Sequence, residues 1–255
     1  MKTIKLLTLT MVAVSLAAFT ARAGIVGSPH DFSGLQYTWN TDPSDPETVC
    51  GVCHVPHHAD SSVVPLWGHQ VTSSAFKMYN QANVPVSSMQ AAVQPSPNGP
   101  SLACLSCHDG TVAINTYGGF PQYGASPWAN QAPGSQGQYI TNTANLGTDL
   151  THSHPISFQY TAALVGTGPN QDQWLYNPDT KIVLTPDSQA GFVPGNSMTV
   201  NGFLLNGNHT VECTSCHDVH NQNGTPYGPN NRKLVKIVGT QAGVGSLLCR
   251  SCHNK

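Results

Sequence analysis

The chain has 255 residues, of which 9% are charged and 39% are apolar, with ten Lys and Arg against twelve Asp and Glu. A globular domain usually carries about 25% charged residues, and so sparse and balanced a charge argues against a nucleic-acid partner. Gly (24) and Pro (19) are frequent, and long runs with helical period are hard to find. Such a chain buries too little apolar surface to offset its ordering entropy alone, so we expect a bound group to form its core.

The N-terminus has the three parts of a secretory signal peptide. Lys2 and Lys5 supply a basic start, an apolar run covers residues 6–19, and residues 21–23 (Ala-Arg-Ala) have the small-x-small pattern that signal peptidase cleaves. We therefore expect residues 1–23 to be removed and the chain to be exported, to the extracellular side or outer surface, with the periplasm as the alternative. The run is too short for a comfortable membrane span, and we expect no transmembrane segment elsewhere.

All eight cysteines lie in C-x-x-C pairs, and each pair is followed at once by histidine. This pattern attaches c-type haem, because two thiols bind the vinyl groups on one porphyrin edge and the next residue then lies under the iron. A disulfide, a zinc site or a thioredoxin-like motif does not require that histidine, let alone four times. The sequence therefore predicts four covalently attached c-type haems. The predicted attachment residues are Cys50, Cys53, Cys104, Cys107, Cys213, Cys216, Cys249 and Cys252. The predicted proximal ligands are His54, His108, His217 and His253.

Each iron needs a sixth ligand, and histidine is the economical choice. Only Met78, Met89 and Met198 follow the signal sequence, too few for four methionine-ligated irons, so we expect two histidines on every iron and correspondingly low potentials. His57 and His220 each follow a proximal histidine by three residues, so we expect them to ligate a neighbouring haem rather than their own. The other candidates are His30, His69 and His154. We expect His58, His152 and His209 to face solvent or to support a haem.

The motifs form two doublets, one near each end of the chain, and each doublet opens with a His-x-x-His unit. This weak internal repeat predicts two di-haem modules, residues 24–110 and 209–255, joined by a Gly-, Asn- and Pro-rich insertion at 111–208. Together they make one tetrahaem domain over residues 24–255. The predicted fold is a multihaem cytochrome c, mostly irregular coil with few short helices and minor β-hairpins wrapped around a core of four haems.

Regular secondary structure should be confined to short segments. Helices are expected around the haem motifs and over residues 73–83. Strands are expected over residues 181–185 and 197–205, which can pair as a surface hairpin.

The order of the motifs and the residues around them resemble the doubled-motif cytochromes c, and more narrowly the four-haem outer-surface filament cytochromes of metal-reducing bacteria. The matching segments are 28–31 (Ser-Pro-His-Asp), 50–57, 65–69 (Pro-Leu-Trp-Gly-His), 104–110, 154–158, 216–220 and 252–255. The resemblance implies a homopolymer with a continuous chain of haems, in which one histidine ligand comes from the adjacent subunit. It leaves open which candidate distal histidine is spare. His30 lies close to the predicted mature N-terminus, so its arm is our expected candidate to cross between subunits.

The predicted function is electron transfer, as the subunit of an extracellular conductive filament that delivers electrons to redox partner proteins or external acceptors. The alternative is a soluble periplasmic electron shuttle with the same haems. A multihaem reductase would need an iron with an open position. Because all four motifs carry histidine and further histidines are abundant, we expect no enzyme activity.

Overall fold

The computed structural model describes residues 24–32, 47–57, 59–60, 63–80, 82–85, 89–114, 139–184, 198–220, 234–241 and 245–254. The predicted signal peptide and His58 lie outside these ranges. Most of the described backbone is irregular, with a few short helices and two-stranded sheets, which agrees with the coil-rich architecture that the sequence predicts.

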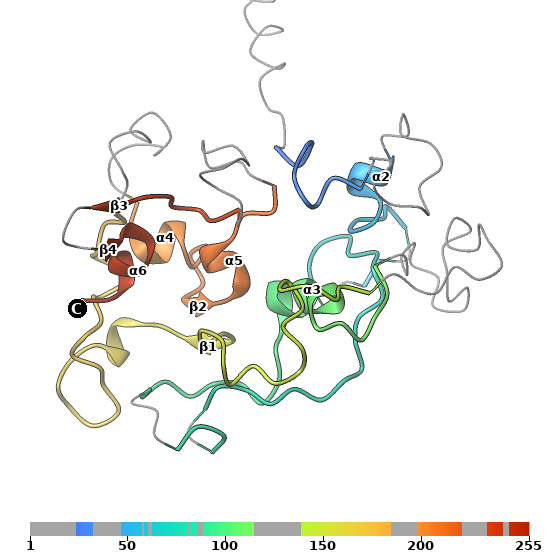
Figure 1. Cartoon of the computed structure of the whole chain (residues 1–255). Coiled ribbons are helices and arrows are strands. Elements are labelled where there is room, and N and C mark those ends of the chain that lie inside the picture. Colours follow the sequence, from blue (N-terminus) through green and yellow to red (C-terminus); the bar gives the residue numbers. More distant parts are fainter. Residues whose placement is uncertain are drawn as a thin grey trace, which may run out of the picture.

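The helices and strands are short, and Figure 1 shows those of the C-terminal half gathered on one side of the molecule and α2 and α3 on the other. The helices are α2 (Glu47–Cys50), α3 (Gly99–His108), the 3-10 turn η2 (Ala162–Leu164), α4 (Val200–Phe203), α5 (Cys213–Cys216) and α6 (Leu247–Cys252). The strands are β1 (Phe158–Gln159), β2 (Thr210–Val211), β3 (Thr240–Gln241) and β4 (Gly245–Ser246). β1 pairs with β2, and β3 with β4, both antiparallel.

Helices lie at all four C-x-x-C motifs, as predicted: α2 ends at the first cysteine of its motif, and α3, α5 and α6 contain both cysteines of theirs. The helix predicted over residues 73–83 is wrong for the described part of that segment, which contains no helix and only a single turn that begins at Asn80. The Lys77 N–H donates to the Thr148 carbonyl at 2.9 Å and the Leu150 N–H to the Lys77 carbonyl at 2.9 Å. This pairing with a distant segment uses the backbone groups that a helix would need.

The strand predicted over residues 197–205 is also largely wrong, because Val200–Phe203 forms helix α4. Thr199 caps this helix by accepting from the Gly202 N–H at 3.1 Å, which favours a helical turn at that point. In the described parts of the two predicted strands, the pairing is limited to a bridge between Ile182 and Thr199.

The largest apolar cluster belongs to the C-terminal half and contains ten buried residues: Phe158, Tyr160, Leu164, Val183, Val200, Leu204, Leu205, Val211, Ile237 and Leu247. Seven of them come from the segment that the sequence predicts to be an insertion between the modules. The described residues of that segment from Phe158 onward therefore pack around the C-terminal C-x-x-C-H motifs, whereas Leu150 packs with Met78 and Leu105.

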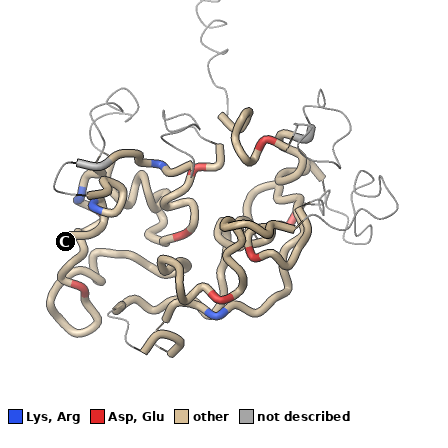
Figure 2. Tube along the Cα trace, in the orientation of Figure 1, with Lys and Arg blue, Asp and Glu red and all other residues tan. Residues whose placement is uncertain are grey.

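Among its described residues, the N-terminal half has small clusters, each of two or three buried residues. Their members are Phe32 and Val52; Val63, Trp67 and Ala103; and Met78, Leu105 and Leu150. Charged side chains are sparse and scattered along the described chain (Figure 2). Within the part of this half that the structure describes, neither burial nor ion pairing of side chains therefore forms a substantial core.

Candidate haem-ligand sites

The C-x-x-C-H motifs share one backbone geometry. The N–H of the histidine donates to the carbonyl of the first cysteine, at 2.8 Å from His54, 3.0 Å from His217 and 2.9 Å from His253. In the remaining motif His108 is the last residue of α3. A single helical turn thus places the two thiols, three residues apart, on the same face, with the histidine directly after them.

Among the described residues, the structure pairs motif histidines from three of the motifs with histidines from distant segments. The ring centroids are 6.1 Å apart for His54 and His220, and 6.0 Å apart for His30 and His108. They are 6.2 Å apart for His154 and His253. Each pair joins one predicted proximal ligand to one predicted distal ligand.

This spacing fits two imidazoles on opposite sides of one metal ion. A metal–imidazole bond is about 2.0 Å long, and the ring centroid lies about 1.1 Å beyond the nitrogen, so two axial ligands place their centroids about 6.2 Å apart. The interplanar angles of 22°, 49° and 74° do not affect this fit, because each ring can rotate about its metal–nitrogen bond.

Backbone carbonyls orient several of these rings. The Nδ1 atom faces the Pro65 carbonyl at 3.0 Å in His54 and the Ala144 carbonyl at 2.9 Å in His108. In His154 it faces the carbonyl of the next residue at 2.8 Å. A carbonyl only accepts, so in this geometry Nδ1 carries the proton and Nε2 keeps its lone pair. This is the usual arrangement of a histidine that ligates a metal.

His30 is further prepared for ligation by burial. Desolvation, with smaller contributions from His108, His217 and His220, lowers the pKa of His30 to about 4. The ring is therefore neutral near pH 7 and can offer a lone pair. His30 pairs with His108 of its own chain, and its expected role as the ligand that crosses between subunits stays a prediction.

The other candidate distal ligands, His57 and His69, differ in their surroundings. His69 is 3% exposed, with Nδ1 at 3.0 Å from the Gln70 carbonyl and Nε2 at 3.0 Å from the Ala113 carbonyl. Burial lowers the pKa of His69, so the ring is neutral and one of its two nitrogens keeps a lone pair. Its Nε2 also lies 3.4 Å from the Cys107 thiol, which can donate to it. His57 is exposed, so its ring is accessible to another molecule.

The histidines that the sequence analysis set aside lie away from these pairs where the structure describes them. His152 is exposed. His209 contacts the Asp179 carboxylate through Nε2 at 2.6 Å.

The remaining motif histidine, His217, is a predicted proximal ligand. It follows α5 and is exposed, and its backbone forms a bridge with Val235.

The four motifs also influence one another through their thiols. Burial and then Cys53 of the first motif raise the pKa of Cys107 in the second. A hydrogen bond with Cys213 of the third motif, followed by burial, raises the pKa of Cys104. Burial and then Cys216 raise the pKa of Cys252 in the last motif to about 12. Thiols of successive motifs therefore lie close enough to affect one another's pKa.

Buried polar atoms give a second test of whether the residues around the histidine pairs fit haem. Among the described residues, His30 Nδ1, Trp67 Nε1 and Thr214 Oγ1 are buried without a hydrogen-bond partner in the protein. Such atoms are costly unless something pairs with them. The carboxylates of haem are acceptors of the kind that an indole or hydroxyl donor needs, so the residues present fit this group.

The described residues contain no group of three or more His, Cys, Asp or Glu side chains arranged to hold a metal ion; the histidines come together in twos. Over the same part of the chain, the structure has no helix that is both long and apolar enough to cross a bilayer. No protein-family model matches the sequence, and a search of curated proteins finds no relative.

Proposed function

We propose that this chain is a tetrahaem c-type cytochrome that transfers electrons. The observation that carries the proposal is the set of three histidine pairs with ring centroids 6.0–6.2 Å apart. Each pair includes the histidine of a C-x-x-C-H motif, so covalent attachment and axial ligation would act on the same group. When bound, haem supplies an iron that cycles between its ferric and ferrous states.

The protein residues have three tasks in this function. The eight cysteines would hold the porphyrins covalently. The three pairs of imidazoles would ligate iron and leave no position for small ligands, which favours outer-sphere electron transfer over catalysis. The close succession of the motifs supports short steps between haems, because Cys104 contacts Cys213 and Cys252 lies near Cys216.

We place the protein in an extracellular filament built from copies of itself, with external acceptors or redox partner proteins as the electron sink. The resemblance noted above and the sparse charge support this assembly, because little like-charge repulsion opposes self-association. Exposed His57 is the candidate distal ligand that another subunit could reach. A soluble periplasmic shuttle with the same haems is the second candidate function, and negative-stain imaging of the secreted protein separates the two.

Replacement of a single histidine tests the ligand pairs. The purified protein should contain four haems by the pyridine haemochrome assay, all low-spin, and bind little carbon monoxide. His154→Ala should keep four haems, since attachment needs only the cysteines, but one should become high-spin and bind carbon monoxide. His152→Ala is the matched control, two residues away and exposed, and should behave like the wild type. Rapid carbon monoxide binding by the wild type would contradict complete ligation by histidine.

A further inference from the structure

Glu212 is a buried acid directly before the third haem motif. It is 6% exposed and is the N-cap residue of α5. Its side chain accepts from the backbone N–H of Ser215, while the Ser215 hydroxyl accepts from the Glu212 N–H at 2.9 Å. This reciprocal pair satisfies amide groups that the start of a helix leaves without intrahelical partners, so Glu212 helps to form the turn that presents Cys213 and Cys216.

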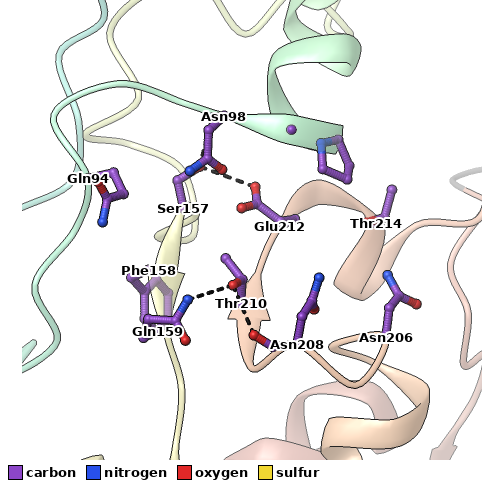
Figure 3. Close-up of a pocket in the computed structure, with 12 residues that line it drawn as sticks. Gln94, Asn98, Ser157, Phe158, Gln159, Asn206, Asn208, Thr210, Glu212 and Thr214 are labelled. Atoms are coloured by element: carbon purple, nitrogen blue, oxygen red, sulfur yellow. Dashed lines mark hydrogen bonds between the residues drawn. The ribbon is translucent and has the colours of Figure 1, made fainter. Parts of the chain in front are cut away.

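The same carboxylate also binds two other segments. Its Oε2 accepts hydrogen bonds from the hydroxyl of Ser101, on α3, and from the hydroxyl of Ser157 at 3.2 Å. Ser101 and Ser157 are both fully buried. Figure 3 shows Ser157 and Glu212 pointing toward each other in the wall of a polar cavity of about 240 Å³. Helix capping alone does not require these contacts.

Ser101 completes a closed set of contacts between the two haem-bearing helices. Its hydroxyl accepts from the backbone N–H of Cys213 at 2.9 Å while it donates to Glu212. One serine of α3 thus binds both the cap and the first cysteine of α5. One turn further along α3, the thiol of Cys104 is in contact with the thiol of Cys213.

From this geometry we infer that Glu212 and Ser101 are positioning residues that fix α3 against α5 and so set the spacing between the second and third haems. The inference rests on the proposed function. Buried hydrogen bonds to a carboxylate are directional and stronger than neutral ones, which suits them to hold two helices at one distance. The junction matters because it joins the N-terminal haem doublet to the C-terminal one.

Ser101→Ala is the decisive variant, because it removes the bridge and leaves the Glu212–Ser215 cap intact. Glu212→Ala removes both the bridge and the cap. Glu212→Gln keeps an acceptor oxygen and should therefore behave more like the wild type than Glu212→Ala does. Thr199→Ala is the matched control, since Thr199 caps α4, a short helix without a haem motif. All variants should retain four haems, because attachment depends on the cysteines.

The readout is circular dichroism in the Soret band, where neighbouring haems give a two-signed signal that weakens as they separate or reorient. Ser101→Ala and Glu212→Ala should lose amplitude while all haems stay low-spin, and Thr199→Ala should match the wild type. Unchanged amplitude in both test variants would overturn the inference, as would an equal loss in Thr199→Ala or a loss of haem in Ser101→Ala. A wild-type protein without haem would instead refute the proposed function.

Discussion

The two halves of the chain bury very different amounts of their own side chains. The C-terminal half has a cluster of ten buried residues, whereas the N-terminal half divides its buried residues into clusters of two or three. Both halves carry two C-x-x-C-H motifs. On the proposed function, the N-terminal half therefore depends on its porphyrins for a core, while the C-terminal half has an apolar core to which the porphyrins are added.

Removing haem from each half should give the largest difference. Cys50→Ala with Cys53→Ala should expose residues 24–114 to proteases, because small clusters cannot offset the entropy of that segment. Cys249→Ala with Cys252→Ala should leave the 158–205 region largely protected. Limited proteolysis with mass spectrometry measures both. If the half that loses its haem were equally protected from proteases in the two variants, the difference in side-chain core would not affect how strongly each half depends on haem.

Truncation within the C-terminal cluster should have the next largest effect. Leu205 is 1% exposed, and Leu205→Ala should reduce the free energy of unfolding by about 2–5 kcal/mol, as for other buried leucines. Leu146→Ala, at a residue that is 45% exposed, is the control and should change it far less. Denaturant titration of the haem-loaded protein gives both values, and a similar small loss in each would argue against a packed core.

Glu212, at the junction of the halves, should make stability depend on pH. Burial raises the pKa of Glu212 above its usual 4.5, against the effect of the Ser101 and Ser157 hydroxyls. Because the pKa of Glu212 is raised in the folded state, the neutral Glu212 side chain stabilises the fold. This stabilisation is complete below pH 4.5 and is lost as pH rises through the raised pKa. Glu212→Gln should remove this dependence. Denaturation midpoints of both proteins, measured from below pH 4.5 upward, would show this loss of pH dependence in the variant. Parallel pH curves for the wild type and Glu212→Gln would contradict the prediction.

The smallest effect is expected at the exposed Lys77–Asp149 pair, 3.3 Å apart. Hydrogen bonds from Thr151, followed by Lys77, lower the pKa of Asp149 to about 2. Its contribution is therefore present above the usual value of 3.8 and is lost as pH falls through about 2. Asp149→Asn should slightly reduce stability near pH 7, less so in high salt. A large loss would show that this surface contact stabilises the N-terminal half more than its exposure allows.

The sequence predicted the coil-rich architecture and the helical turns at the motifs, because C-x-x-C-H spacing and Gly/Pro content are local properties. It named both histidines of each observed pair as candidate ligands but could not match them, since pairing depends on how distant segments pack. It failed at residues 73–83 and 200–203, where backbone pairing with residue 148 and the Thr199 cap determine the outcome.

The sequence analysis also missed Glu212 and Ser101. The only local signal was a capping residue before Cys213 with a serine three positions later, which predicts a helix start. Nothing in the sequence places Ser101, more than a hundred residues earlier, beside it. That contact exists only because α3 and α5 pack together, so no local pattern could have revealed it.

The His54–His220 pair has a consequence for the order in which the protein matures. If the chain is exported as proposed, translocation from the N-terminus would carry the first C-x-x-C-H motif into the oxidising compartment while His220, more than half the chain further on, has not yet followed. On the proposed function, the first haem is attached before its second axial ligand arrives, and for that interval its iron is open to oxygen and other small molecules. Completion of the first site must then wait for almost the last part of the chain, which makes full translocation a condition for a closed redox centre.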